Sequence, residues 1–112
     1  MERWETLPDF PKYQISDSGK IMNRETQHIL TPYKNHKGYL KVAIIGTDGK
    51  PHKKRVHRLV AQTFIPNTNG LPEVNHKNLN KQDNTVTNLE WVTGEENREH
   101  YKRMKNERTH SV

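Results

Sequence analysis

The stretch from residue 73 to residue 97 constrains the fold of this chain more than any other. It reads EVNHKNLNKQDNTVTNLEWVTGEEN, with short apolar segments at 73–76 and 88–92 on either side of a long polar segment. The pattern predicts a strand, a polar loop, a second strand and then a helix. Such a long loop in a small domain is usually functional or mobile. In this unit, His76 would end the first strand and Asn97 would lie on the helix.

The predicted helix has a recognisable start. Thr93 and Glu96 fit a capping box, in which the side chain of each residue hydrogen-bonds the backbone amide of the other. The helix is expected to run from about Gly94 to Lys105 or Glu107. Residues 109–112 are expected to form a frayed tail.

In the first half of the chain, the pattern of strands and turns predicts a small antiparallel sheet with basic side chains on one face. Segments 13–15 and 20–22 flank a turn-rich stretch and are expected to pair as a hairpin. Segment 38–45 is rich in β-branched and aromatic residues, and an Asp-Gly hairpin signal separates it from segment 53–56. These segments supply the strands of the expected sheet.

A first helix is predicted between the sheet and the 73–97 unit. Residues 57–64 have helical spacing, because Val56, Leu59, Val60 and Phe64 fall on one stripe. A proline shortly after this segment sets the end of the helix.

Composition limits the size of the core and the class of protein. The chain has 112 residues, of which 29% are hydrophobic, so we expect one domain, or one domain with a small appendage, around a thin core. It has no cysteine, which excludes a disulfide framework and a cysteine-ligated zinc finger. No apolar run is long enough to span a membrane, and the first residues lack the apolar region of a signal peptide. A cytoplasmic or otherwise intracellular location is therefore expected.

The positive charge indicates a polyanionic partner. The net charge is +6 and the isoelectric point is about 9.7. Many of the cations cluster at the predicted second hairpin, at the start of the first helix and on the last helix. Such clusters suit the phosphate backbone of double-stranded DNA. The candidate DNA-binding residues are Lys34, Lys37, Lys41, Lys53, Lys54, Arg55, Arg58, Arg98 and Lys102.

Two segments of the chain resemble a known family. Residues 54–97 look like the HNH endonuclease motif of phage-encoded and intron-encoded homing endonucleases. Residues 2–45 look like the N-terminal DNA-binding module that often precedes this motif, through Trp4 with Leu7-Pro8, Tyr13-Gln14-Ile15-Ser16 with Gly19, and Leu30-Thr31-Pro32 with Gly38-Tyr39. Together the two similarities cover nearly the whole chain.

The resemblance implies a fold and a division of the chain. It implies an α+β fold, in which a small antiparallel N-terminal sheet precedes a ββα-metal core of the His-Me finger type. Residues 1–53 would form the DNA-binding module, residues 54–108 the nuclease core and residues 109–112 a flexible tail.

The resemblance also implies roles for single residues. His76 matches the general base, and a neutral imidazole near pH 7 can take a proton from water. Asn88 matches the residue that holds this histidine, through its backbone or its side chain, and fixes the orientation of the ring. Asn97 matches the metal ligand on the helix, and its amide oxygen suits one Mg²⁺ or Mn²⁺ ion per site. His57 matches a histidine common in this branch and is expected to be structural or to orient phosphate.

Asn75 departs from the pattern of the family. Many members carry Asp or His just before the base, as a metal ligand, and an amide oxygen binds a hard cation less strongly. Either Asn75 and Asn97 hold the metal together with phosphate oxygens and water, or the site is weakened or inactive. His100 is a rival or supplementary ligand, because it lies one turn after Asn97 on the same helix face.

The sequence therefore supports two hypotheses. The first is a metal-dependent DNA endonuclease, monomeric or homodimeric, which nicks one strand with His76 as base. The second is a non-catalytic DNA-binding accessory or regulatory protein with a degenerate HNH site, which Asn75 favours. A structural protein without a nucleic acid partner fits neither the charge nor the spacing. The sequence does not distinguish DNA from RNA, and it does not give a target sequence.

Overall fold

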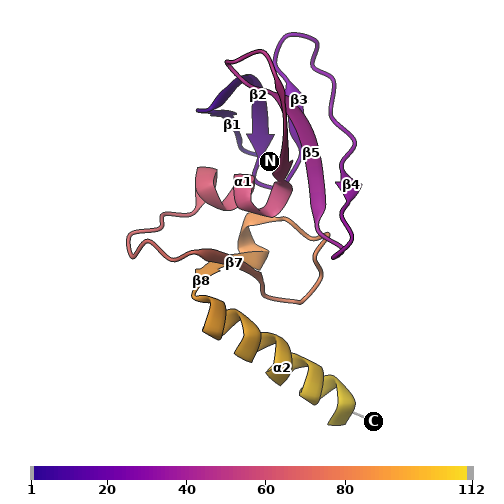
Figure 1. The fold of residues 1–112 in the computed structure, drawn as a ribbon, viewed down its shortest axis with the longest axis vertical. Helices are drawn as coiled ribbons and strands as arrows, with labels where there is room; N and C mark the ends of the chain where they lie inside the picture. The colour runs from indigo at the N-terminus through magenta and orange to yellow at the C-terminus, as the bar shows by residue number, and fades with distance from the viewer. Residues whose placement is uncertain (1, 111–112) are drawn as a thin grey trace.

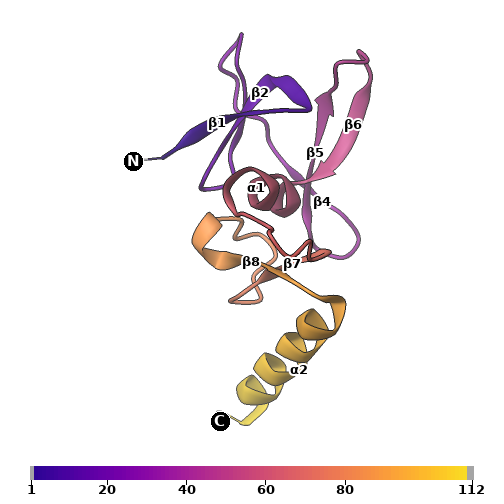
Figure 2. The same ribbon diagram turned by 90° about the vertical axis from the view of Figure 1, so that its left-hand side faces the viewer.

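The computed structural model describes the backbone of residues 2–110 and the side chains of residues 2–105. Two three-stranded antiparallel sheets, a helix, a β-hairpin and a second helix follow one another along the chain. In Figures 1 and 2 the two sheets lie at one end, helix α1 lies in the middle, and helix α2 projects from the other end. The molecule is therefore elongated, with extents of 49 × 30 × 30 Å.

The first sheet contains strands β1 (Trp4–Leu7), β2 (Phe10–Ser16) and β3 (Ile21–Asn23). The pairs Tyr13↔Asn23 and Ile15↔Ile21 confirm the predicted hairpin. Its turn includes a glycine with a positive φ, a conformation that residues with a side chain rarely adopt.

The second sheet contains strands β4 (Tyr33–Lys34), β5 (Leu40–Ile45) and β6 (Pro51–Arg55). The β5–β6 hairpin confirms the prediction, but the sequence indicated one sheet and the structure has two. The Asn23 side chain accepts hydrogen bonds from two backbone amides just beyond β3, and this turn brings the chain back beside β3 through a single Met22↔Ile29 bridge before it continues to β4.

Helix α1 (Val56–Phe64) forms the centre of the hydrophobic core. Val56, Leu59 and Val60 are buried as the stripe predicted, whereas Phe64 is only partly buried. The core continues from the two sheets through α1 to the last hairpin. The N-terminal sheets and the C-terminal half therefore share one core.

The last hairpin and the second helix agree with the predicted unit. The hairpin contains β7 (Glu73–His76) and β8 (Leu89–Val92), with a 3₁₀ turn (Val86–Asn88) just before β8. Asn88 therefore lies in that turn, and the strand begins one residue later than predicted. Trp91, on β8, is partly buried, and its indole N–H donates to the Ile65 carbonyl just after α1.

Helix α2 (Gly94–His110) begins at the predicted capping box. The Thr93 hydroxyl accepts from the Glu96 amide at 3.1 Å, and the Glu96 carboxylate accepts from the Thr93 amide at 3.0 Å. The helix is longer than predicted and includes Thr109 and His110, because no proline or glycine interrupts a run of good helix formers. The rest of the expected tail, Ser111 and Val112, lies outside the described residues.

The expected division of the chain stays a prediction. Its boundary between residues 53 and 54 falls inside β6, and α1 packs against strands on both sides of that boundary. Within the described residues, no helix is both long enough and apolar enough to cross a bilayer. The expected cytoplasmic location also stays a prediction.

Candidate active site and nucleic-acid interface

Three of the predicted site residues meet around one small cavity. Asn75 and His76 reach it from β7, and Asn97 reaches it from the first turns of α2. The cavity has a volume of about 40 Å³, which is enough for a water molecule or a cation with little else. The other residues that line it are Tyr39, Val74, Leu79, Lys81 and Tyr101.

The His76 ring is buried and held in one orientation. Its side chain is 5% exposed, and its Nε2 lies 2.7 Å from the Asn84 amide oxygen. An amide oxygen can only accept, so Nε2 carries the proton and Nδ1 presents its lone pair. Burial lowers the pKa of His76, and the bond to Asn84 opposes this only in part. A neutral ring with a free Nδ1 is the form that a general base requires.

Asn84 is a site residue that the sequence did not single out. It lies near the end of the polar stretch 77–87, which was expected to be functional or mobile but gave no reason to choose one residue. The side chain is 4% exposed in the structure. The spacing in the sequence pointed to Asn75, Asn88 and Asn97 instead. Only the folded loop shows that the Asn84 side chain is the one that hydrogen-bonds the His76 ring.

Among the described residues, the Asn88 side chain forms no hydrogen bond with the His76 ring, and the expected role of Asn88 in holding this histidine stays a prediction. Its side chain instead donates to the Asn78 amide oxygen at 3.0 Å and to the Asp83 carbonyl at 2.9 Å. Its own amide oxygen accepts from the Asn78 backbone, and its carbonyl accepts from the Lys77 backbone. Asn88 therefore ties together the loop that follows His76.

His57 lies in a stack of rings behind His76. The His57 ring is 4.9 Å from both the Tyr39 ring and the His76 ring, measured between centroids. It is 5% exposed, and its Nδ1 has no hydrogen-bond partner. Burial, followed by the nearby His76, lowers the pKa of His57 to about 3. A neutral ring stacked on its neighbours supports the structural role expected for His57.

The side-chain amides of Asn75 and Asn97 differ in their hydrogen bonding. Asn75 is 4% exposed and its Nδ2 has no hydrogen-bond partner. The Nδ2 of Asn97 donates to a carboxylate oxygen of Glu73 at 2.9 Å, so its own oxygen is turned away from Glu73. A side chain at Gly94 would begin 2.7 Å from the other Glu73 oxygen, so this glycine leaves room for the carboxylate. Glu73 was not predicted to belong to the site.

The side chains of Asn75 and Asn97 are suited to a divalent cation that takes its remaining ligands from water and the substrate phosphate. No group of three or more His, Asp or Glu side chains suited to a metal occurs among the described residues. The two amide groups nevertheless line one cavity, and a half-turn of the unpaired Asn75 amide exchanges its nitrogen for an oxygen. Mg²⁺ commonly takes few protein ligands and completes its shell with water and phosphate oxygens. The donor set is therefore suited to a weakly held Mg²⁺ or Mn²⁺ ion.

His100 is not brought to this cavity. Its Nε2 donates to the Lys77 carbonyl at 2.9 Å, and its Nδ1 accepts from the Arg103 guanidinium at 3.3 Å. Both nitrogens would have to leave these partners before either could bind a metal. Its assignment as a ligand stays a prediction that the geometry does not favour.

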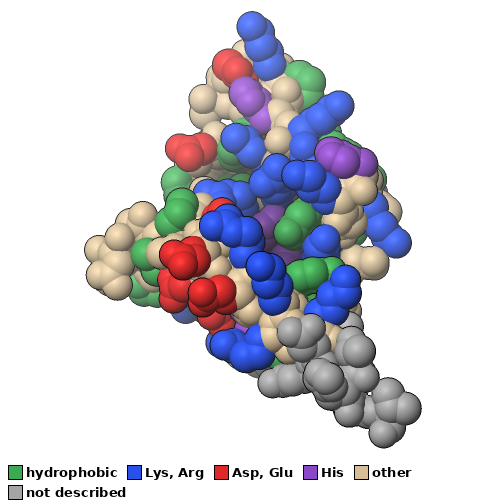
Figure 3. Space-filling view, turned by 60° about the horizontal axis from the view of Figure 1, so that its bottom comes forward, with side chains coloured by type: hydrophobic (Ala, Val, Ile, Leu, Met, Phe, Trp, Pro, Cys, Tyr) green, Lys and Arg blue, Asp and Glu red, His purple; other side chains and the backbone are tan. Residues whose placement is uncertain are grey.

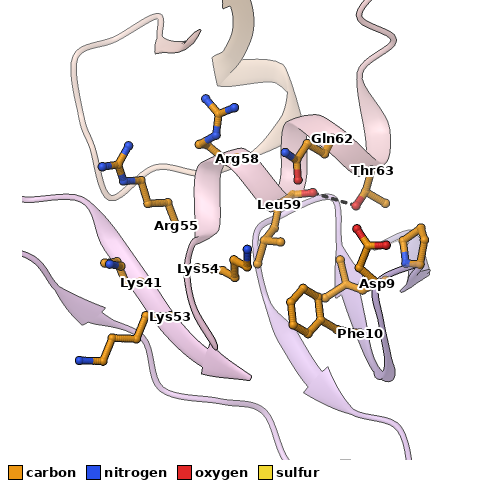
Figure 4. Close-up of a pocket in the computed structure, with 12 residues that line it drawn as sticks. Asp9, Phe10, Lys41, Lys53, Lys54, Arg55, Arg58, Leu59, Gln62 and Thr63 are labelled. Carbon is orange, nitrogen blue, oxygen red and sulfur yellow. Dashed lines mark hydrogen bonds between the residues drawn. The ribbon is translucent and has the colours of Figure 1, made fainter. Parts of the chain in front are cut away.

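The cations gather around two neighbouring hollows. The larger, of about 610 Å³, lies between the β1–β2 turn, β6 and α1, and five of the predicted DNA-binding residues line it. Figure 4 shows these side chains around the hollow, with Lys54 directed toward Phe10. The five are Lys41, Lys53, Lys54, Arg55 and Arg58.

The second hollow leads from the first toward the candidate active site. It has a volume of about 550 Å³, and its lining includes Lys37, His57 and Asn97. Arg55 and Arg58 line both hollows, so the basic surface is continuous. Figure 3 shows Lys and Arg side chains across the middle of one face, beside a patch of acidic side chains.

Three predicted DNA-binding residues lie elsewhere. Lys34 on β4 and both Arg98 and Lys102 on α2 are exposed but line neither hollow. Arg98 and Lys102 are one turn apart on α2 and extend the positive charge beyond the site.

Comparison with protein families gives two matches that together span most of the chain. Residues 2–45 match the family described as "NUMOD4 motif", and residues 54–99 match the family described as "HNH endonuclease". The first matched segment is the one that carried the resemblance in the sequence, and the second extends two residues beyond the segment 54–97.

Individual proteins and a solved structure are similar over the same region. The chain is 42% identical over 105 residues to "Uncharacterized HNH endonuclease L247" of Acanthamoeba polyphaga mimivirus, which covers 88% of this chain and 26% of that protein. It is 30% identical over 100 residues to "H-N-H endonuclease F-TflII" of Escherichia phage T5, which covers 88% of this chain and 51% of that protein. The chain thus spans between about a quarter and about a half of these curated relatives.

The structure described as "DNA binding and cleavage by the HNH homing endonuclease I-HmuI" matches with a TM-score of 0.82 and 31% identity. The match covers 92% of this chain and 59% of that chain. It confirms the expected α+β class, with N-terminal antiparallel strands followed by the strand–helix unit.

Proposed function

The chain belongs to the HNH endonuclease family and carries a NUMOD4 motif ahead of its HNH region, and on that premise we propose that it is a metal-dependent DNA endonuclease. One observation carries the proposal. A neutral imidazole with a free Nδ1 lies beside two amide side chains at the end of a continuous basic surface. Phosphodiester hydrolysis needs these parts together: a base, a cation site and a surface that holds the phosphates.

In this proposal, His76 accepts a proton at Nδ1 from the water that attacks the scissile phosphorus. Asn75 and Asn97 hold one Mg²⁺ or Mn²⁺ ion through their amide oxygens. When bound, such an ion supplies positive charge against the charge that develops on the phosphate and the leaving oxygen. Asn88 keeps the loop after His76 in place through its bonds to Asn78 and Asp83.

The basic surface would hold the substrate backbone. Arg55 and Arg58 border both hollows, and Lys37 borders the one that reaches Asn97. Cations in this arrangement bind successive phosphates and bring one of them to His76. One site per chain cleaves one strand at a time, so we propose that a monomer nicks duplex DNA and that a homodimer is needed for a double-strand cut.

A second candidate function is a DNA-binding accessory protein with a degenerate site. The observation that favours it is the neutral Asn75, together with the lack of a clustered acidic ligand set among the described residues. This alternative keeps the basic surface and the DNA partner but predicts no cleavage with either metal.

Supercoiled plasmid distinguishes the two. Purified protein with Mg²⁺ or Mn²⁺ should convert it to open circles, and both EDTA and the His76→Ala variant should abolish the conversion. Linear product at early times would indicate a dimer. A gel shift with no cleavage under either metal would reject the nuclease and favour the accessory protein. Single-stranded and duplex RNA of matched length would test the preference for DNA.

A further inference from the structure

The hydrogen bond between His76 and Asn84 is the tightest side-chain contact of the candidate site. The two groups are 2.7 Å apart and both residues are buried, at 5% and 4% exposure. The rings of Tyr39 and His57 lie tilted beside the His76 ring, with centroids 5.9 Å and 4.9 Å from it. Asn84 is therefore the group that decides which nitrogen of His76 carries the proton.

Asn84 is held in place by contacts on both sides. On one side, the residue before it belongs to the loop network: the Asp83 carbonyl accepts from Asn88, and the Asp83 carboxylate accepts from Asn78 at 3.0 Å. These bonds hold the backbone just before Asn84 in place. Through them, Asn88 helps to position Asn84 and thereby the His76 ring.

On the other side, the turn between β2 and β3 packs closely against Asn84. Gly19 approaches so closely that a Cβ there would lie 3.0 Å from the Asn84 Cβ and 3.1 Å from its carbonyl oxygen. Two residues earlier in this turn, the Asp17 carbonyl accepts from the Val86 amide at 2.9 Å. The turn thus contacts the chain at Asn84 and just after it.

The turn itself is rigid enough to act as a support. Ser16 is fully buried, and its hydroxyl accepts from the amides of Ser18 and Lys20. Its backbone also closes the turn through the bonds from Gly19 to Ser16 and from Ser16 to Lys20. The contact therefore joins a fixed turn of the N-terminal sheet to the loop that carries Asn84.

We propose that Asn84 is a positioning residue for His76, which keeps the proton on Nε2 and Nδ1 free, and that the β2–β3 turn of the N-terminal sheet holds Asn84 in place. This inference rests on the proposed function for the role of His76 as base, but its geometric part does not. The N-terminal sheet then supports the chemistry through Asn84, in addition to its proposed contribution to DNA binding.

The first test reads the His76 ring by long-range ¹H–¹⁵N NMR at about pH 8, where the imidazole is neutral. The wild-type protein should show the Nε2–H tautomer. Asn84→Ala should give a mixture of tautomers or the Nδ1–H form, whereas Asn84→Asp keeps an oxygen acceptor and should retain Nε2–H. Gln82→Ala, an exposed change in the same loop, is the control and should leave the ring signals unchanged.

The second test measures single-turnover nicking at saturating DNA. Asn84→Ala should slow the reaction by about tenfold or more with unchanged DNA affinity, as is typical when an orienting partner is lost. Asn84→Asp should recover part of the rate. A wild-type Nε2–H signal together with a wild-type rate in Asn84→Ala would overturn the proposal.

The support from the turn is tested with a matched pair of glycines. Asparagine tolerates a positive φ better than most residues, so Gly19→Asn adds a side chain against Asn84 with less backbone strain than other substitutions would cause. Gly70 also has a positive φ, but nothing lies within 4 Å of its Cβ position, so Gly70→Asn is the control. Gly19→Asn should alter the His76 tautomer signal and Gly70→Asn should not. Equal spectra for the two variants would overturn the role of the turn.

Failure of the inference and failure of the proposed function remain distinct. If wild-type protein does not nick DNA, the NMR experiment still tests whether Asn84 and Gly19 set the state of His76. If wild-type protein nicks and His76→Ala does not, the function stands, and normal nicking and tautomer signals in the Asn84 variant would reject only the inference.

Discussion

At the scale of single residues, the site depends on neutral groups held by neighbours. His57 and His76 are buried side by side, and burial lowers the pKa of both. Asn97 is oriented by Glu73. The Glu73 carboxylate accepts a hydrogen bond from the Asn97 side-chain nitrogen, so the Asn97 side-chain oxygen can bind another partner. Position 75 thus has no carboxylate, but the Glu73 carboxylate lies nearby and orients Asn97, the residue proposed to bind the metal.

Glu73→Gln should weaken metal binding. The neutral amide of glutamine polarises Asn97 less than a carboxylate does, and loss of such orienting groups typically lowers metal affinity by about 10- to 100-fold. The measurement is calorimetric titration of Mn²⁺ into the protein–DNA complex, in a His76→Ala background that prevents cleavage.

The control for this titration is Glu99→Gln. It removes the same charge from an exposed position of α2 and should leave the Mn²⁺ affinity unchanged. Equal losses in both variants would mean that Glu73 contributes only general negative charge.

Buried His57 should make stability fall as the pH falls. Its pKa is about 3 in the folded protein, against 6.5 for an ordinary histidine, so the unfolded chain binds a proton first. The stabilisation is therefore complete above about pH 6.5 and is lost progressively toward pH 3, by about 1.4 kcal/mol per pH unit.

Urea unfolding at two pH values measures this loss. The free energy of unfolding should fall by about 2 kcal/mol between pH 7 and pH 5 from His57 alone, with a further loss of the same sign from His76. His57→Phe keeps a ring against Tyr39 and should reduce the fall. An identical pH dependence in this variant would contradict the assignment.

At the scale of elements, the start of α2 sets the position of Asn97. The capping box fixes the first turn of the helix, and Asn97 lies in the second turn. The Asn97 amide also donates to the Thr93 carbonyl at 3.0 Å, as the first helical bond of that turn. A change at the cap should therefore affect both the stability of the helix and the position of Asn97, the proposed metal ligand.

Thr93→Ala should lower the free energy of unfolding by about 1 kcal/mol, the usual cost of losing a helix cap. Urea denaturation measures this loss, and Thr87→Ala, at an exposed position just before β8, is the control. A loss equal to that of the control would show that the cap does not limit the stability of the protein.

At the scale of the whole molecule, one basic surface runs over parts that are far apart in the sequence. The two hollows share Arg55 and Arg58, and one of them reaches Asn97 from a lining that includes Lys37. Binding energy gained along the N-terminal sheets can therefore be used to hold a phosphate at the site.

The affinity for a short DNA duplex should depend steeply on salt. If six phosphates are bound, log K should fall with log salt with a slope of about −5. Arg55→Ala should make the slope shallower by about one unit. Fluorescence anisotropy at several salt concentrations measures the slope, and Lys12→Ala, which lines neither hollow, is the control. A wild-type slope shallower than about −2 would contradict the proposed surface.

The sequence by itself determined the local elements and three of the residues around the cavity. Periodicity, the Asp-Gly turn and the capping box depend on neighbours a few residues apart, so they could be predicted without the fold. The resemblance likewise marked Asn75, His76 and Asn97, which do meet at one cavity.

Only the tertiary structure decided which groups support the site. Asn84 meets His76, Glu73 meets Asn97, and Gly19 meets Asn84 from the other half of the chain. The physical reason is that hydrogen bonds and close contacts of this kind depend on the path of a long loop and on the packing of one sheet against it. No local pattern encodes that path, because several asparagines of the loop have the same chemistry and differ only in where the fold brings them.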